Sequence, residues 1–160
     1  MTSRDAMRRF GAAHAALWVP MLALEWRMNR AGGAGIVPFE LAGTPERARE
    51  LMERWGEDGR RAARLSLLLD YPFLVSYTGV QVAGCTAAGE LLPAVRVVVA
   101  LQVAAGAFDA AENTALLGVL SGREGGRLPA VARACALAKF ALLGVGWAYA
   151  LAGLAARLRR

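Results

Sequence analysis

The sequence is short of the residue types that build many common sites. It contains one histidine, His14, and two cysteines, Cys85 and Cys135, with no CxxC pair. A bis-histidine haem site therefore lacks its second ligand, and a thiol–disulfide relay lacks its usual motif. One histidine and scattered carboxylates also lack the spacing of a defined metal site. From these absences we expect neither a metal nor any other cofactor.

Charge is also scarce, and it is missing from long stretches of the chain. Charged residues make up 20% of the 160 residues, whereas hydrophobic residues make up 56%. The charges gather at the N-terminus, in residues 27–64 and 123–133, and at the C-terminus. This layout is typical of a helical protein that crosses a membrane several times, and it disfavours an ordinary soluble domain. The predicted fold class is all-α, an integral membrane four-helix bundle.

Lysine is almost absent, because only Lys139 among the 19 basic residues is not arginine. The net charge of +6 is compatible with a nucleic-acid partner. However, the arginines flank hydrophobic stretches, where they meet lipid headgroups and set the orientation of the spans. We therefore expect the lipid bilayer, and no nucleic acid, as a partner.

The chain is predicted to be a single transmembrane domain, residues 1–160, with four spans. The spans cover about residues 10–27, 65–89, 94–120 and 129–156, close to the roughly 20 apolar residues that a bilayer requires. No small-residue cleavage site follows the first apolar stretch, so we interpret that stretch as a retained span. A glycine-rich turn is expected at 122–126. Four spans place both termini on one side, which we interpret as the cytoplasmic side of the cell inner membrane.

An amphipathic helix is predicted between spans one and two, over about residues 45–63. Thr44 followed by Pro45 is a favourable helix start. Apolar residues then recur at helical spacing, with charged pairs on the opposite face. We expect this helix to lie on the membrane surface or over the mouth of the bundle. A solvated linker helix remains the alternative.

Polar residues interrupt the spans at a few positions. Five of them fall at similar depth, in the half of the bundle away from the termini: Asp70, Asp109, Glu112, Asn113 and Lys139. His14, Gln81 and Gln102 are placed in the other half by the same helical rise. Ionisable residues at such depths usually face a bundle interior and mark a functional site. Tyr77, Trp18 and Trp147 are expected to supply apolar walls.

Three acids and one lysine cannot all ionise cheaply in a site of low dielectric constant. We expect Lys139 to pair with one acid and at least one other acid to be protonated at neutral pH. Asp109 and Glu112 are the candidate catalytic residues, as proton donor and acceptor. Asp70, Asn113, Lys139 and Tyr77 are the candidate substrate-binding residues. The alternative is a structural polar cluster that only ties the helices together.

Several motifs carry a resemblance to known proteins. They are Phe39-Glu40-Leu41-Ala42-Gly43-Thr44, Trp55, Asp70-Tyr71-Pro72-Phe73 with Tyr77, and Phe108-Asp109-Ala110-Ala111-Glu112-Asn113. With these motifs the chain resembles a group of small, uncharacterised bacterial four-span membrane proteins, over roughly residues 10–150. The resemblance implies the fold and the importance of the acidic residues and Asn113, but no reaction. A looser similarity, in span count and buried acids, is to the EXPERA group, some members of which isomerise sterols by proton transfer.

The pattern leaves three functions open. The leading hypothesis is a membrane-embedded site for a lipophilic small molecule, either for binding alone or for isomerase-like proton transfer. The second is a proton- or cation-linked transporter subunit in a homo-oligomer, with Gly144, Gly146 and Gly153 supporting close helix contacts. The third is an accessory membrane subunit with no chemistry. The sequence alone decides neither the ligand nor whether the protein is an enzyme.

Overall fold

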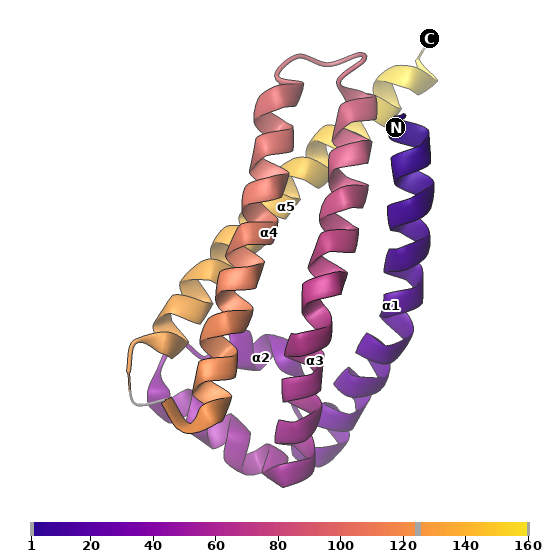
Figure 1. Cartoon of the computed structure of the whole chain (residues 1–160). Coiled ribbons are helices and arrows are strands. Elements are labelled where there is room, and N and C mark those ends of the chain that lie inside the picture. The colour runs from indigo at the N-terminus through magenta and orange to yellow at the C-terminus, as the bar shows by residue number, and fades with distance from the viewer. Residues whose placement is uncertain (1, 124–125, 160) are drawn as a thin grey trace.

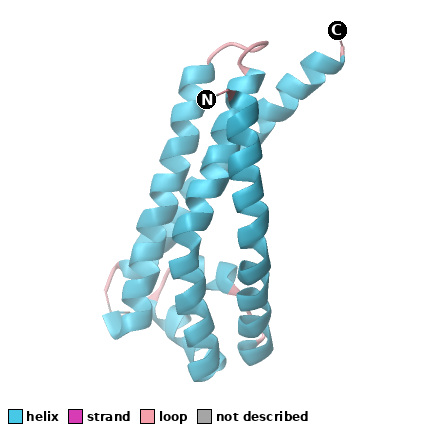
Figure 2. Cartoon of the chain, turned by 45° about the vertical axis from the view of Figure 1, so that its right-hand side comes forward, coloured by secondary structure: helices cyan, strands magenta, loops and turns pink. Residues whose placement is uncertain are grey.

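The computed structural model describes residues 2–123 and 126–159, and the chain is all-helical over this part. Its long helices are α1 (Ser3–Gly32), α3 (Pro45–Ala88), α4 (Val95–Gly118) and α5 (Leu128–Leu158). A short helix, α2 (Ile36–Glu40), joins α1 to α3, and a π-helical turn, η1 (Val119–Arg123), follows α4. The long helices run alongside one another, and the two termini lie at the same end (Figures 1 and 2). The all-α prediction is confirmed.

Two helices begin after a threonine cap, α1 well before the predicted span at 10–27. The side chain of Thr2 accepts a hydrogen bond from the backbone of Asp5, whose carboxylate in turn accepts from Thr2. The side chain of Thr44 caps α3 in a similar way through Arg47, and Pro45 occupies the first helical turn. Such caps satisfy backbone N–H groups that have no partner within the helix. The expected helix start at Thr44 is thus confirmed.

The break between the surface helix and the next long helix lies at Gly56, and the predicted boundary at 63–65 is wrong. Gly56 has φ 58° and ψ −161°, which are not helical values. This region of backbone space is open to glycine and costly for other residues. The chain therefore turns at Gly56 and continues as one uninterrupted helix to Ala88. Of the turn expected at 122–126, Gly122 has a positive φ of 85°, and residues 124–125 lie outside the described residues.

The apolar core lies at the end opposite the termini. There α2 and the first part of α3 cover the ends of α1 and α4 and the start of α5 (Figure 1). Phe39 and Trp55 are fully buried with their ring centroids 5.1 Å apart. The indole of Trp55 donates a 2.6 Å hydrogen bond to the carbonyl of Ala34. This packing fixes α2, and with it Glu40, against the ends of the long helices.

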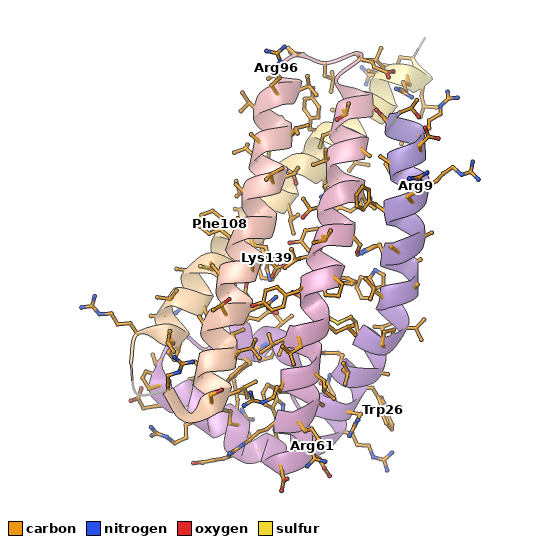
Figure 3. The ribbon with its side chains drawn as sticks, viewed as in Figure 1. Arg9, Trp26, Arg61, Arg96, Phe108 and Lys139 are labelled. Atoms are coloured by element: carbon orange, nitrogen blue, oxygen red, sulfur yellow. The ribbon has the colours of Figure 1, made fainter. Side chains whose placement is uncertain are left out.

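In the middle of the molecule, apolar side chains face outward and polar side chains face inward. Large apolar side chains such as Val103, Phe108 and Leu151 are exposed, whereas four polar side chains of α4 are buried: Gln102, Asp109, Glu112 and Asn113. Figure 3 shows Phe108 pointing away from α4, Lys139 among the helices, and Arg96 and Arg61 at the two ends. Buried polar groups beneath an apolar surface are unusual for a water-soluble bundle, because exposed apolar patches usually mark an interaction surface.

One helix of the described chain, α5, is long and apolar enough to cross a membrane by length and composition. By that measure the predicted span at about 129–156 is supported, and the other three predicted spans are not. In α4, the buried side chains of Gln102, Asp109 and Glu112 lower the average hydropathy. An average over the helix does not distinguish these inward-facing groups from the exposed apolar side chains of α4, such as Val97, Val103 and Phe108.

Candidate functional site

The centre of the candidate site is the amine of Lys139, which is 6% exposed on α5. Its Nζ donates a 2.9 Å hydrogen bond to Oδ1 of Asp109. It also lies 2.9 Å from Oε2 of Glu112 and 3.8 Å from Oε2 of Glu40. The expectation that Lys139 pairs with an acid is confirmed, and the amine serves more than one carboxyl group.

Glu40 belongs to this cluster but is not among the site residues predicted from the sequence. It is 8% exposed at the end of α2, which places its carboxyl beside Lys139. The signal was its position as the only charge in the apolar stretch Ile36–Leu41. Docking of this short helix onto α5 is a tertiary contact that helical periodicity does not reveal.

The position of α2 depends on Glu25, near the end of α1. Oε2 of Glu25 accepts a 3.0 Å hydrogen bond from the backbone N–H of Ile36, the first residue of α2. Oε1 accepts from the side chain of Asn29. A side chain at Gly35 would collide with this carboxyl group, so glycine is needed there for the close approach. Glu25 thus substitutes for the missing side-chain cap of α2.

The remaining predicted residues extend the cluster across α3 and α4. Tyr77 donates a 2.7 Å hydrogen bond to Oδ2 of Asp109. Asn113 donates a 2.7 Å hydrogen bond to Oδ2 of Asp70. Asp109 therefore receives both the lysine amine and the tyrosine hydroxyl, while Asp70 receives an amide N–H. Asp109, Glu112, Lys139 and Tyr77 form one connected group, and Asp70 with Asn113 forms a pair beside it.

Several buried polar atoms of this region have no hydrogen-bond partner. They include Oε2 of Glu40 and both carboxyl oxygens of Glu112, although Oε2 of Glu112 lies within ion-pair distance of Lys139. Glu112 is fully buried. A buried polar cluster that only holds helices together is expected to satisfy its members, because each unpaired group costs about 1–3 kcal/mol. The remaining carboxyl oxygens therefore require a proton or a donor from a ligand to be satisfied.

Electrostatics act strongly on Glu40. Burial raises the pKa of its carboxyl, and the negative charge of Asp109 adds to this effect. The amine of Lys139 opposes the rise in pKa without cancelling it. Because burial disfavours the charged form of an acid, Glu40 retains its proton to a higher pH than an exposed glutamate.

A cavity of about 480 Å³ opens directly onto this cluster. Its polar lining includes Glu40, Asp70, Tyr77, Asp109 and Lys139. Its size falls in the range of roughly 300–1,000 Å³ that is common for small-molecule sites. Glu112 is not among the lining residues, although Lys139, which it contacts, is.

The walls of the cavity are apolar and aromatic. They comprise Trp18, Met21, Leu22, Ile36, Val37, Phe73, Val80, Phe140, Leu143 and Trp147. The most exposed of them are Leu22 on α1, at 56%, and Trp147 on α5, at 57%. The lining therefore includes apolar side chains of α1 and α5 that are also exposed at the outer surface. The predicted apolar walls Tyr77, Trp18 and Trp147 all line this space.

The cavity also reaches residues that were placed in the other half of the bundle. His14 and Gln81 line it together with the acidic cluster. Trp18 donates to Nε2 of His14 at 3.0 Å, and Nδ1 of His14 lies 3.1 Å from the hydroxyl of Ser76. Gln102 does not line the cavity and instead donates to the carbonyl of Leu142.

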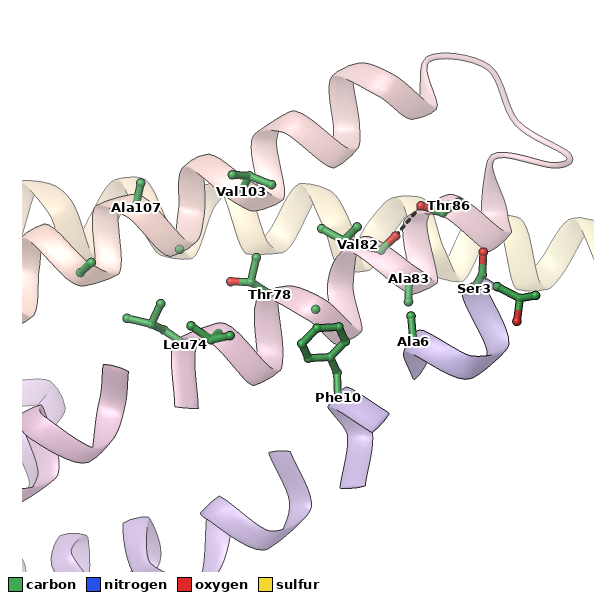
Figure 4. A pocket seen from close by; sticks show the side chains of 15 residues that line it. Ser3, Ala6, Phe10, Leu74, Thr78, Val82, Ala83, Thr86, Val103 and Ala107 are labelled. Carbon is green, nitrogen blue, oxygen red and sulfur yellow. Dashed lines mark hydrogen bonds between the residues drawn. The ribbon is translucent and has the colours of Figure 1, made fainter. Parts of the chain in front are cut away.

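A second and larger space, about 690 Å³, lies away from this chemistry. It is a groove among α1, α3 and α4, where Phe10, Leu74, Thr78 and Val103 approach one another (Figure 4). The dashed bond in Figure 4 runs from the hydroxyl of Thr86 to the carbonyl of Val82. None of its lining residues is ionisable. The groove therefore offers apolar contact, and the cavity with the acidic cluster is the better candidate site.

Two of the glycines proposed for contacts between copies have another use. Gly146 makes room for the side chain of Gln102, and Gly153 lies against Ala88 of α3. Both contacts are within the chain, so these residues do not form an outward-facing stripe. Gly144 has nothing within 4 Å of the position its side chain would take.

The site can thus hold an apolar molecule with a polar end, and its groups can accept hydrogen bonds or exchange protons. Comparison with known proteins does not add a precedent. No protein-family model, no curated protein and no solved structure matches this chain.

Proposed function

We propose that this chain is a four-span membrane protein whose acid–lysine cavity binds a lipophilic small molecule. In this proposal α1, α3, α4 and α5 form a four-helix bundle in the cell inner membrane, with cytoplasmic termini. The first half of α3 and α2 lie at the opposite membrane surface.

The observation that carries the proposal is the lining of the cavity. Glu40, Asp109 and Lys139 line it together with aromatic and aliphatic side chains, several of which are also exposed at the outer surface. In a bilayer those exposed side chains would face acyl chains. A lipophilic molecule could then enter sideways from the membrane, with its polar end against the cluster and its apolar body between α1 and α5.

Proton transfer is the chemistry that this arrangement offers. Asp109 faces the cavity and is hydrogen-bonded to Lys139 and Tyr77, so it is the group best placed to exchange a proton with a bound molecule. Glu112 lies behind Lys139 and does not line the cavity. We therefore propose ligand binding as the function, with Asp109 as the proton-exchanging residue and Glu112 as its neighbour in the cluster.

The test is to identify what co-purifies with the protein in mild detergent. Mass spectrometry of wild type is expected to show a discrete lipophilic compound that is reduced in Asp109→Asn. Glu57→Gln is the matched control, because Glu57 lies on the charged surface and pairs with Arg61. Bulk phospholipid alone on all three proteins would overturn the proposal.

A further inference from the structure

The cavity has more negative than positive groups in its lining. Its carboxyl groups are those of Glu25, Glu40, Asp70 and Asp109, against the single amine of Lys139. That amine already contacts Asp109 and Glu112, each at 2.9 Å. No arginine lies among the described residues that line the cavity. An anionic ligand would therefore find no free positive charge here.

Glu40 supplies a second, independent observation. Its Oε2 atom is buried without a hydrogen-bond partner, and its side chain lines the cavity. A buried carboxyl oxygen without a partner is costly unless something in the cavity satisfies it. The nearest cation, Nζ of Lys139, is 3.8 Å away and is closer to two other acids. A positively charged donor on a ligand would supply the hydrogen bond that Oε2 of Glu40 lacks.

The walls are suited to the same kind of ligand. Trp18 and Phe73 meet edge to face with their centroids 5.3 Å apart, and Phe73 lies 6.1 Å from Tyr77. The faces of aromatic rings attract cations, and aromatic cages bind quaternary ammonium groups. The cavity already contains one such contact, since Nζ of Lys139 lies 4.8 Å from the centroid of Phe140.

We infer that the ligand is a lipophilic cation, an amine or other onium group on an apolar body, held by Glu40 and Asp70 against the aromatic walls. This inference rests on the proposed function and names the chemical class of its ligand. The positive end offsets the surplus of acidic groups over Lys139, and its charge favours the ionised form of Glu40, whose pKa burial otherwise raises. The apolar body fills the space toward Leu143 and Trp147. A neutral molecule of the same shape gains the apolar contacts but not the charge interaction.

Three probes of matched shape separate charge from hydrophobicity. Tetraphenylphosphonium carries a positive charge, tetraphenylborate a negative charge, and the neutral isostere tetraphenylsilane none. Binding to the full chain in nanodiscs is measured by isothermal titration, with empty nanodiscs subtracted. We expect the cation to bind at least about tenfold more tightly than the neutral probe, because a desolvated charge pair contributes strongly to affinity. The anion is expected not to compete.

The variants locate the charge. Glu40→Gln and Asp70→Asn are each expected to weaken cation binding by about tenfold or more and to leave the neutral probe unchanged. Glu57→Gln is the control on the exposed surface. Leu143→Trp, which fills the cavity, should abolish binding of both probes. Thermal unfolding of each variant shows whether it is folded, and two independent acid variants protect the test from the failure of one.

The outcomes distinguish this inference from the proposal beneath it. Equal binding of the cation and the neutral probe, both lost in Leu143→Trp, would overturn the cation and leave the lipophilic cavity intact. Preferential binding of the anion would do the same. Binding of no probe would overturn the inference, and the co-purification experiment would then decide the cavity separately.

Discussion

At the residue scale, the structure depends on how one amine is shared among several acids. Lys139 contacts Asp109 and Glu112 and lies near Glu40, all of them buried. Such a cluster adds little net stability compared with an apolar core, because every charge must first lose its water. Removing one member is different, since the remaining charges are then left buried without compensation. The acids and the lysine are therefore best understood as a unit.

Lys139→Met is expected to destabilise the protein by about 3–5 kcal/mol, since it strips Asp109 and Glu112 of their counter-charge. The double variant with Asp109→Asn should recover part of the loss, because it removes one of the orphaned carboxylates. Thermal unfolding in detergent measures both. Arg157→Met is the control: Arg157 pairs with Glu90 at the surface, and losing such a pair costs about 0–1 kcal/mol. Wild-type stability of Lys139→Met would refute the shared-amine description.

The titration of Glu40 makes the free energy of unfolding depend on pH, in a direction that follows from its raised pKa. Burial raises the pKa of its carboxyl in the folded protein, so the folded state binds a proton more tightly than the unfolded chain. The free energy of unfolding should therefore fall as the pH rises from the ordinary pKa to the raised one, by at most about 1.4 kcal/mol per pH unit. Glu40→Gln cannot ionise, and its stability relative to wild type should increase over the same interval. A series of melting curves against pH measures this, and parallel curves for the two proteins would contradict it.

At the element scale, the turn between α3 and α4 contains a residue in an unfavourable conformation. Ala94, which precedes α4, has φ 65° and ψ 18°, in the left-handed region. That conformation costs a residue with a β-carbon roughly 1–2 kcal/mol. Ala94→Gly is therefore expected to stabilise the protein by about 1 kcal/mol, measured as a higher midpoint of thermal unfolding. Ala104→Gly within α4 is the matched control and should destabilise by about 0.5–1 kcal/mol. A lower midpoint for Ala94→Gly would show that the turn needs alanine for another reason.

The sequence was informative where local chemistry decides the outcome. Thr44 and Pro45 predicted the start of α3, and helical rise brought Asp109, Glu112 and Lys139 to one depth. The sequence was less informative about features that depend on contacts between segments distant in the chain. Charge and periodicity continue smoothly through residue 56, so nothing in them showed that Gly56 would break the helix. Glu40 was missed for the same reason, because its burial depends on α2 docking under Glu25.

The whole molecule combines an apolar outer surface with charged ends, which is the basis for placing it in a bilayer. The two termini lie at one end and Arg61 at the other (Figures 1 and 3). If the long helices span the membrane, these ends face opposite compartments. The arrangement can be tested without knowledge of the ligand.

In a background with Cys85→Ala and Cys135→Ala, single cysteines at Arg61 and Arg157 are expected to differ in accessibility. Arg61→Cys should react with a membrane-impermeant maleimide in intact spheroplasts, and Arg157→Cys only after lysis. The side chains of both arginines are exposed, so burial within the protein would not explain a difference. Labelling of both sites from the same side, or recovery of the protein in the soluble fraction, would contradict a membrane-spanning arrangement.

The scarcity of lysine makes the cavity open to chemical footprinting. Lys139 carries the only ε-amine in the chain, and that amine lies at the cavity floor. An acylating reagent that modifies lysine side chains therefore has one such target, and its reaction is expected to be slow because the buried amine is held by Asp109 and Glu112. Any molecule that fills the cavity should slow that reaction, so occupancy can be read directly from the mass of a single peptide.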